Sequence, residues 1–413
     1  MTMSKSEWNP RRLDELGFLG RGKSRHRPRN DASLYGGPYP FIQTADVMAA
    51  DPYITGYSQT YSELGFKQSK MWPPETLCMT IAGANTAKTA ILKFEACFPD
   101  SIVGFIPDKS KSDIVFVKYA LDMMRDRFLS VSRGATQDNL GLDKILSFPI
   151  LAPNVEGQRR IGAILSAYDE LMENSQRRIR ILETMARALY REWFVHFRFP
   201  GHEAVPRVAS PLGPIPQGWE VKKLPECIYI NPRVTVPREG EKPFLPMGCL
   251  STDSMLISDI ESRSGNSGSK FQNGDTLFAR ITPCLENGKT GFVQFLPDAH
   301  AVGFGSTEFI VLRSRTLTPE IVYVLARSDE FRGNAIKSMS GASGRQRVQE
   351  ACFDDYTIAH PPRALLDQFS AIVAPSFQMI HRLHLQIQNL RQTRDLLLPR
   401  LLSGQIALNS KEI

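Results

Sequence analysis

The stretch Ala87-Lys88-Thr89-Ala90-Ile91-Leu92-Lys93-Phe94 returns 201 residues later as Gly288-Lys289-Thr290-Gly291-Phe292-Val293-Gln294-Phe295. Further matches follow in the same order at offsets of 200 to 211 residues. A solenoid repeat is roughly 20 to 50 residues long, so each copy here has the size of a domain. The sequence therefore predicts two copies of one domain, related by a pseudo-two-fold axis, which suits a target with two parts. The other matched pairs are Trp8–Leu13 with Trp219–Leu224, Pro40-Phe41 with Pro243-Phe244, Thr76-Leu77 with Thr276-Leu277, Gly134-Ala135 with Gly341-Ala342, and Ile179 and Leu182 with Ile387 and Leu390.

The composition is that of a basic globular protein. The chain has 413 residues, of which 42% are hydrophobic, and a net charge of +7. Residues 1–30 carry eight Lys and Arg against three acidic residues, so most of the positive charge lies at the start of the first copy. This concentration indicates a polyanionic partner, and a solvated basic tail is the alternative.

The cysteines and the hydropathy limit the class of protein further. The six cysteines lie far apart without a C-x-x-C pair, which excludes the usual zinc and disulfide spacings. The sequence has no signal-peptide-like apolar segment at its start and no apolar run of 18 residues. We therefore expect a cytoplasmic protein with reduced thiols, without a contact to membranes.

The hydrophobic period changes once in each copy. From Gln158 to Trp193, and again after Pro361-Pro362, apolar residues recur at heptad spacing. Each pattern predicts a helix of roughly 35 to 40 residues, which is not stable alone with a single apolar stripe, so the two should pair as an antiparallel coiled coil. Pro375 and Pro399 predict ends or kinks in the second helix.

The expected fold class is α+β, with two similar domains separated by two long antiparallel helices and related by an internal pseudo-two-fold repeat. The expected boundaries are residues 1–155 for the first domain, 156–198 for the central helix, 199–218 for a proline-rich linker, 219–362 for the second domain and 363–406 for the distal helix.

The segment Gly17-Phe18-Leu19-Gly20-Arg21-Gly22-Lys23-Ser24 fits the phosphate-loop pattern G-x-x-x-x-G-K-[ST]. Its flanks predict neither a buried strand before it nor a helix after it, which a phosphate loop requires. We interpret the segment as a flexible basic loop that contacts a DNA backbone or groove. The candidate residues are Arg21, Lys23, Arg25, Arg27 and Arg29.

Each copy also has loops rich in hydrogen-bond donors, at residues 83–89 and 133–137 in the first and at 282–290 and 341–346 in the second. Asn can bind adenine, and Lys or Arg can bind guanine or phosphate, so these loops are candidates for DNA contacts. A hairpin turn kept for its geometry is the alternative. The candidate residues are Asn85, Lys88, Gln137, Arg280, Asn287, Lys289 and Arg345.

The sequence lacks the constellations of an enzyme. Asp51-Pro52-Tyr53 lacks the second proline of the loop with which amino-methyltransferases hold a target amine, and no glycine-rich methyl-donor loop accompanies it. The seven histidines have no metal-ligand spacing. We therefore expect a binding protein with no catalytic residue, no metal and no cofactor of its own.

Six segments spread over nearly the whole chain are similar to one protein family. They are Gly20–Asn30, Gly36–Thr44, Gly134–Gln137, Gln158–Leu165, Arg187–Phe194 and Leu398–Gly404. With them the chain resembles the specificity (S) subunit of bacterial type I restriction-modification systems. The resemblance implies two target recognition domains, each of which reads one half of a split DNA sequence, and two conserved helices that hold the domains apart. The second copy departs more from the family, with Pro361–Gln368 in place of the tighter first version.

The resemblance also implies partners. A specificity subunit binds double-stranded DNA and docks two methyltransferase subunits and restriction subunits, and S-adenosylmethionine, ATP and magnesium are then needed by those partners. The alternative is a self-contained methyltransferase-specificity chain or nuclease. Aromatic residues crowd the end of the first helix, and such surface usually marks a protein interface. The expected partner-binding residues are Tyr190, Trp193 and Phe194.

Overall fold

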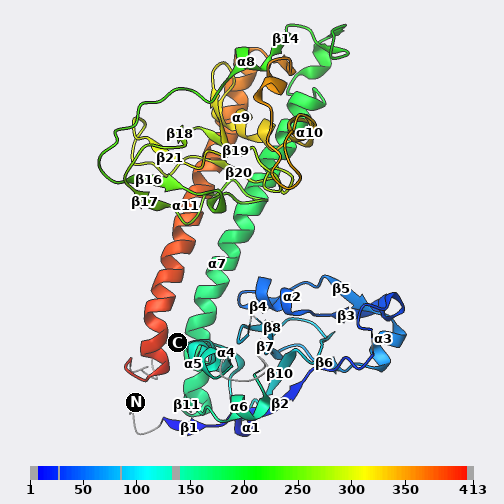
Figure 1. The fold of residues 1–413 in the computed structure, drawn as a ribbon, viewed down its shortest axis with the longest axis vertical. Helices are drawn as coiled ribbons and strands as arrows, with labels where there is room; N and C mark the ends of the chain where they lie inside the picture. The colour runs from blue at the N-terminus through cyan, green and yellow to red at the C-terminus, as the bar shows by residue number, and fades with distance from the viewer. Residues whose placement is uncertain (1–7, 27, 84–85, 133–139, 407–413) are drawn as a thin grey trace. The chain divides into compact units, whose positions relative to one another are not determined.

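The computed structural model describes residues 8–26, 28–83, 86–132 and 140–406 (Figure 1). The chain divides into two compact units. Unit 1 combines residues 1–173 with residues 389–413, and unit 2 consists of residues 174–388. Two long helices, α7 (Val155–Tyr190) and α11 (Arg363–Leu402), each contribute one part to unit 1 and the other to unit 2.

The described part of unit 1 contains two larger sheets, one two-stranded sheet and several short helices. One sheet has the strand order β2-β10-β7-β8-β4 and the other β5-β3-β9-β6, while β1 pairs with β11 beside them. Every residue of β7 and β8 is buried, so these strands form the centre of the core. The elements are β1 (Asn9–Arg11), α1 (Leu13–Leu16), β2 (Gly17–Arg21), η2 (Ala32–Leu34), β3 (Tyr35–Phe41), α2 (Thr44–Ala49), β4 (Tyr53–Ile54), β5 (Gln59–Tyr61), α3 (Glu63–Lys67), β6 (Met71–Trp72), β7 (Leu77–Thr80), β8 (Thr89–Leu92), β9 (Ala96–Cys97), β10 (Ile102–Pro107), α4 (Ile114–Met123), α5 (Arg125–Ser132), α6 (Leu142–Leu146) and β11 (Ile150–Ala152).

Unit 2 repeats this arrangement. Its sheets have the orders β15-β22-β19-β20 and β17-β16-β21-β18, and β14 pairs with β23. The elements are η4 (Arg191–Val195, a π-helical turn), η5 (His202–Ala204), β12 (Arg207–Val208), β13 (Ile215–Pro216), β14 (Glu220–Lys223), α8 (Leu224–Cys227), β15 (Ile228–Ile230), β16 (Lys242–Leu245), η6 (Met247–Cys249), β17 (Glu261–Arg263), β18 (Ser269–Phe271), β19 (Thr276–Ala279), β20 (Thr290–Phe292), β21 (Gly303–Gly305), β22 (Phe309–Ser314), α9 (Pro319–Ala326), α10 (Asp329–Lys337), η7 (Glu350–Phe353) and β23 (Thr357–His360).

The strand registers confirm the internal repeat residue by residue. Leu19 pairs with Phe105 as Ile230 pairs with Leu312. Similarly, Met79 pairs with Val103 as Phe278 pairs with Ile310. Phe278 thus stands where Met79 stands, and the match of Thr76-Leu77 with Thr276-Leu277 is wrong by one residue.

A positive backbone angle fixes that register in both copies. Glu75 (φ 61°) and Gly274 (φ 89°) precede the equivalent strands. Each donates its backbone N–H across the sheet, Glu75 to the carbonyl of Leu92 and Gly274 to the carbonyl of Val293. Identical residue types were therefore a poorer guide to the alignment than this backbone hydrogen bond.

The heptad stripes of both long helices are buried or half-buried, as predicted. On α7 the buried positions include Ile161, Leu165 and Ile179, and Trp193 is buried in the π-helical turn η4 that follows; on α11 they include Val373, Ile380, Leu383 and Leu401. Neither Pro375 nor Pro399 ends α11, which continues to Leu402. Pro375 lies on the exposed side of the helix, where water can bind the carbonyl that lacks its N–H partner. No helix in the described part of the chain is both long and apolar enough to span a membrane.

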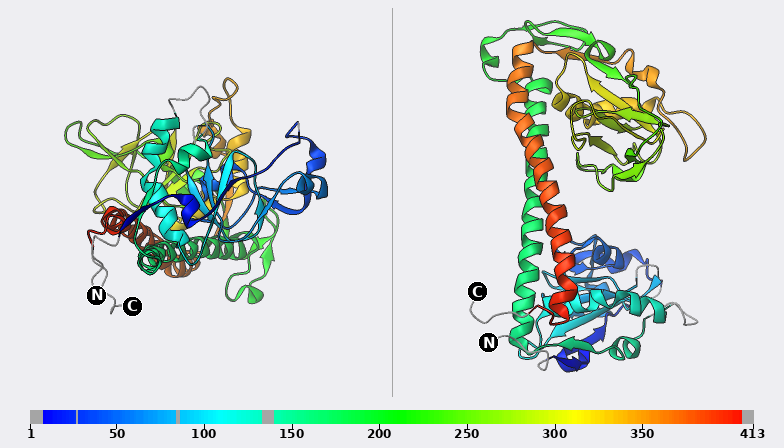
Figure 2. Two further views of the ribbon diagram at one scale, coloured as in Figure 1. Left: turned by 90° about the horizontal axis from the view of Figure 1, so that it is seen from below. Right: turned by 90° about the vertical axis from the view of Figure 1, so that its left-hand side faces the viewer.

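Within each unit the two helices lie side by side and run antiparallel (Figures 1 and 2). In unit 1, Arg394 of α11 forms an ion pair with Asp169 of α7 at 2.8 Å, and the hydroxyl of Tyr119 on α4 also donates to Asp169 at 2.7 Å. In unit 2, Trp193 after α7 meets Phe369 near the start of α11, with ring centroids 5.9 Å apart. The segment expected to be a linker folds into a hairpin of β12 and β13.

Candidate nucleic-acid interface

The basic segment of residues 21–29 in unit 1 is anchored through its backbone. Gly22 and Lys23 donate their N–H groups to the carbonyls of Ile102 and Phe98, both at 2.9 Å. The side-chain carbonyl of Gln68 accepts the N–H groups of the two residues after Ser24. The expectation of a flexible loop is therefore wrong for the described part of this backbone, because the neighbouring chain holds it.

The phosphate-loop pattern does not form a phosphate loop. Gly17–Arg21 is strand β2, paired with β10, and no α-helix begins directly after Ser24. A phosphate loop needs a helix N-terminus at that point. Gly22 serves packing instead, because a Cβ atom there would lie 2.2 Å from the carbonyl oxygen of Pro99.

The basic side chains of this segment differ in their availability. Arg21 and Arg25 are exposed and Lys23 is half-buried, and none has an ion-pair partner within the described residues. Arg29 donates to both carboxylate oxygens of Asp100, at 2.7 and 3.0 Å. Arg27 lies outside the described residues. Arg21, Lys23 and Arg25 are therefore placed to meet a polyanion, whereas Arg29 is already neutralised.

Of the remaining candidates of unit 1, the structure describes Lys88, which directly precedes strand β8. Lys88 is half-buried, and its carbonyl accepts the N–H of Thr80 at 3.0 Å, which closes the turn between β7 and β8. Asn85 and Gln137 lie outside the described residues.

Unit 2 brings its two predicted loops together. Thr282 donates its N–H to the carbonyl of Gln346, and Gln346 donates its N–H to the hydroxyl of Thr282, both at 3.0 Å. Arg345 and Asn287 are exposed in these loops. The amine of Lys289 donates to a backbone carbonyl at 3.1 Å and is half-buried, so it is less available than predicted.

A polar cavity of about 470 Å³ in unit 2 is lined by Arg280, which precedes the first of these loops. Two further cations, Arg233 and Lys270, line the same wall, and neither was predicted from the sequence. Arg280 is bound to Glu350 at 3.0 Å, and Lys270 donates to the carbonyl of Gly268 at 2.8 Å. Arg233 is exposed and has no partner within the described residues. A comparison of the chain directly after β2 and β15 would have pointed to Arg233.

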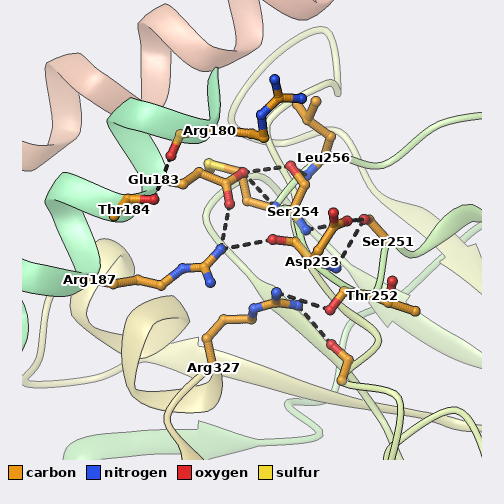
Figure 3. A network of polar contacts seen from close by, with 12 residues as sticks. Arg180, Glu183, Thr184, Arg187, Ser251, Thr252, Asp253, Ser254, Leu256 and Arg327 are labelled. Atoms are coloured by element: carbon orange, nitrogen blue, oxygen red, sulfur yellow. Dashed lines mark hydrogen bonds and ion pairs between the residues drawn. The ribbon is translucent and has the colours of Figure 1, made fainter. Parts of the chain in front are cut away.

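Buried polar contacts attach unit 2 to its part of helix α7 (Figure 3). Glu183, only 3% exposed, accepts hydrogen bonds from the hydroxyl of Ser254 at 2.6 Å and from the N–H of Met255 at 2.8 Å. It also pairs with Arg187 at 2.7 Å, and Arg187 donates to the carbonyl of Asp253 at 2.9 Å. The segment of residues 251–256 is thereby fixed to the helix.

The same segment connects to a predicted DNA-facing loop. Arg327 donates to the carbonyl of Thr252 at 3.1 Å and to that of Gly288 at 2.7 Å. Figure 3 shows Arg327 below the Glu183 contacts, reaching the neighbouring turn. Helix α7 therefore supports the loop of residues 282–290 through two arginines and one buried carboxylate.

The predicted partner-binding aromatics lie at the end of α7. Trp193 is 5% exposed and packs on Phe369, while Phe194 contacts the rings of Phe369 at 5.0 Å and Trp219 at 6.0 Å. The expectation of uncovered aromatic surface is therefore wrong for Trp193, because α11 covers it. Tyr190 and Phe194 line an apolar cavity of about 390 Å³.

The fold and the candidate site together define a duplicated protein with basic loops on equivalent scaffolds. Residues 5–184 match the family model described as "Type I restriction modification DNA specificity domain". The chain is 24% identical over 97% of its length to the type I restriction enzyme MjaIX specificity subunit of Methanocaldococcus jannaschii, covering 94% of that protein. It is 34% identical over 36% of its length to the EcoEI specificity subunit of Escherichia coli, covering 26% of that protein.

The fold is also similar to a solved structure. The S subunit of the type I restriction-modification system of M. genitalium superposes with a TM-score of 0.58 at 15% identity, over 95% of this chain and 96% of that one. The resemblance found in the sequence is confirmed: residues 5–184 match the type I restriction-modification specificity domain, and the chain is similar over nearly its whole length to a type I specificity subunit. The relatives are named for specificity, which agrees with the expectation that catalysis does not reside in this chain.

Proposed function

We propose that this protein binds a bipartite double-stranded DNA sequence, with one half-site read by the sheets and loops of each unit. One observation carries the proposal: two units whose shared strands follow the same order, with β4 as an additional edge strand in unit 1, present different basic side chains at their strand ends. Unit 1 offers Arg21, Lys23 and Arg25, and unit 2 offers Arg233 and Arg345. Lys and Arg of this kind supply the phosphate contacts and guanine contacts of DNA-binding proteins.

An exchange of domains tests this proposal. Residues 1–155 are replaced by the equivalent segment of a relative with another target, and the methylated sequence is mapped in cells that carry the complete system. We expect one half of the target to change and the other half to remain. A change in both halves, or in neither, contradicts separate reading by the two units.

The proposed partners are two methyltransferase subunits, one for each half, and restriction subunits that join the complex. The partners would use S-adenosylmethionine, ATP and magnesium, while this chain supplies the target. The apolar cavity at the end of α7 supports a docking role, because exposed Val195 and Leu212 line it together with Tyr190 and Phe194.

Variants that place a negative charge at the rim of that cavity test the docking role. Val195→Asp and Leu212→Asp should reduce the amount of methyltransferase that copurifies with the co-expressed chain, because each puts a carboxylate into an apolar contact. Val208→Asp is the control, since Val208 is also exposed and does not line the cavity. Copurification that is equal for all three variants would place the methyltransferase elsewhere.

A further inference from the structure

We propose that Arg233 reads a guanine in the half-site of unit 2 and determines the specificity of that half. The inference rests on the proposed function and assigns a base to one side chain of the cavity lined by Arg233, Lys270 and Arg280. Arg233 contacts the base. Lys270 and Arg280 are positioning residues that keep the wall of the cavity positively charged.

The three cations are specific to unit 2. Leu19 of unit 1 and Ile230 of unit 2 occupy equivalent positions. Three residues after them stand Gly22 and Arg233, respectively. Two residues after Met79 and Phe278 stand Ile81 and Arg280, and both donate an N–H to an equivalent carbonyl, of Ser101 and Glu308.

The third cation, Lys270, also has no cation at the equivalent position of unit 1. Met71 pairs with Cys97 on β9, as Lys270 pairs with Phe304 on β21. Unit 1 therefore has glycine, isoleucine and methionine where unit 2 has arginine, arginine and lysine.

In unit 1 the equivalent space beside Gly22 is closed. A Cβ atom at Gly22 would lie 2.2 Å from the carbonyl oxygen of Pro99 and 2.4 Å from that of Phe98, so no side chain fits there. In unit 2 the chain leaves the sheet after Asn231, and the cavity opens beside Arg233. A contact made here can thus distinguish one half-site from the other.

The chemistry of the cavity favours guanine. Among the described residues no carboxylate lines it, and the charged groups of its wall are all cations. In the major groove, guanine presents the two acceptors N7 and O6, whereas adenine and cytosine present an amino donor that cations repel. Arg280 already binds Glu350 and Lys270 already binds Gly268, but the guanidinium of Arg233 keeps its donors for a two-point contact.

The test uses the full chain co-expressed with its methyltransferase subunits, with methylation mapped over a DNA library randomised in both half-sites. We expect R233A to lower the preference for guanine at one position of one half-site by about 5- to 150-fold, the range for loss of a bidentate contact. R233K should lose most of that preference too, because lysine lacks the planar fork. R263A, which removes an exposed arginine of unit 2 outside the cavity, should leave the motif unchanged.

Other outcomes overturn the inference. If R233A weakens methylation of all sequences equally and R233K restores it, Arg233 contacts a phosphate. If the motif of R233A equals that of the wild type, Arg233 reads nothing. In each variant, the unchanged half-site shows that the complex is folded and active. Loss of methylation at both half-sites together with a lower thermal midpoint would be a folding defect. In that case R233K decides between the outcomes. A wild-type complex without any sequence preference refutes the proposed function, and the inference with it.

Discussion

Replacing Glu183 with alanine should loosen the segment of residues 251–256 from helix α7 and lower the free energy of unfolding of unit 2. The carboxylate accepts two short hydrogen bonds, from Ser254 and Met255, and hydrogen bonds to a charged group contribute about 1.5–3 kcal/mol each. The ion pair with Arg187 adds less, since that side chain is 36% exposed and water screens it. Alanine leaves the fully buried Met255 N–H without an acceptor.

We therefore expect a loss of about 3–5 kcal/mol for Glu183→Ala, in the range seen when one partner of a buried polar pair is removed. Glu183→Gln keeps an acceptor for Met255 and should cost about 1–2 kcal/mol. Hydrogen exchange of the Met255 amide measures the local effect, and urea unfolding of the full chain measures the global one. Glu173→Ala changes an exposed glutamate on the same helix and serves as the control. The reasoning is refuted if Glu183→Ala and Glu173→Ala have equal unfolding free energies and equal Met255 protection.

Three further predictions concern a buried ion pair, a close backbone approach and two buried histidines. Arg394→Ala should lower the unfolding free energy of unit 1 in urea by about 3–5 kcal/mol, because it leaves the buried Asp169 carboxylate without its cation. The double variant Asp169→Leu, Arg394→Met should recover most of this loss, and equal stability of the single variant and the wild type would contradict the prediction. Gly22→Ala should destabilise unit 1 by about 1–3 kcal/mol relative to Gly141→Ala, whose Cβ meets open space, and thermal midpoints that fall equally would argue against the close approach at Gly22. Burial lowers the pKa of His360 and of His381 below the ordinary 6.5, so the unfolded chain binds protons first and the stability of unit 2 should fall as the pH drops below about 6.5. The double variant His360→Gln, His381→Gln should make the thermal midpoint depend less on pH between 7.5 and 5.5, and an unchanged slope would exclude both histidines as the cause.

The sequence predicted the large features of the fold because they depend on long, regular patterns. The heptad stripe from Ile161 to Trp193 spans several helical turns, so single deviations do not obscure it. The internal repeat appeared through short identical segments, and the strand orders confirm it. Pro375 was misleading, because a proline on the solvent side of a helix with a firmly packed apolar face costs too little to end it.

The candidate site was less predictable, since it depends on contacts between residues far apart in the chain. Arg29 has the same charge as Arg21, but Asp100 neutralises Arg29, and nothing in the local sequence shows that pairing. Arg233 was missed because it stands alone, without the basic neighbours that drew attention to residues 21–29. The cavity that gives Arg233 its importance forms only when β15, β18 and β22 come together.

Unit 1 combines two segments that lie far apart in the sequence, and this has a consequence for biosynthesis. Leu398 and Leu401 are buried in its core, and Arg394 reaches Tyr119, 275 positions away. A nascent chain can close unit 2 once Gln388 has left the ribosome, whereas unit 1 must wait until the end of helix α11 has also been translated. Until then the apolar surface that receives Leu398 and Leu401 stays open, and a truncated product would expose it permanently to chaperones and proteases. The half that is translated first is thus the half that matures last.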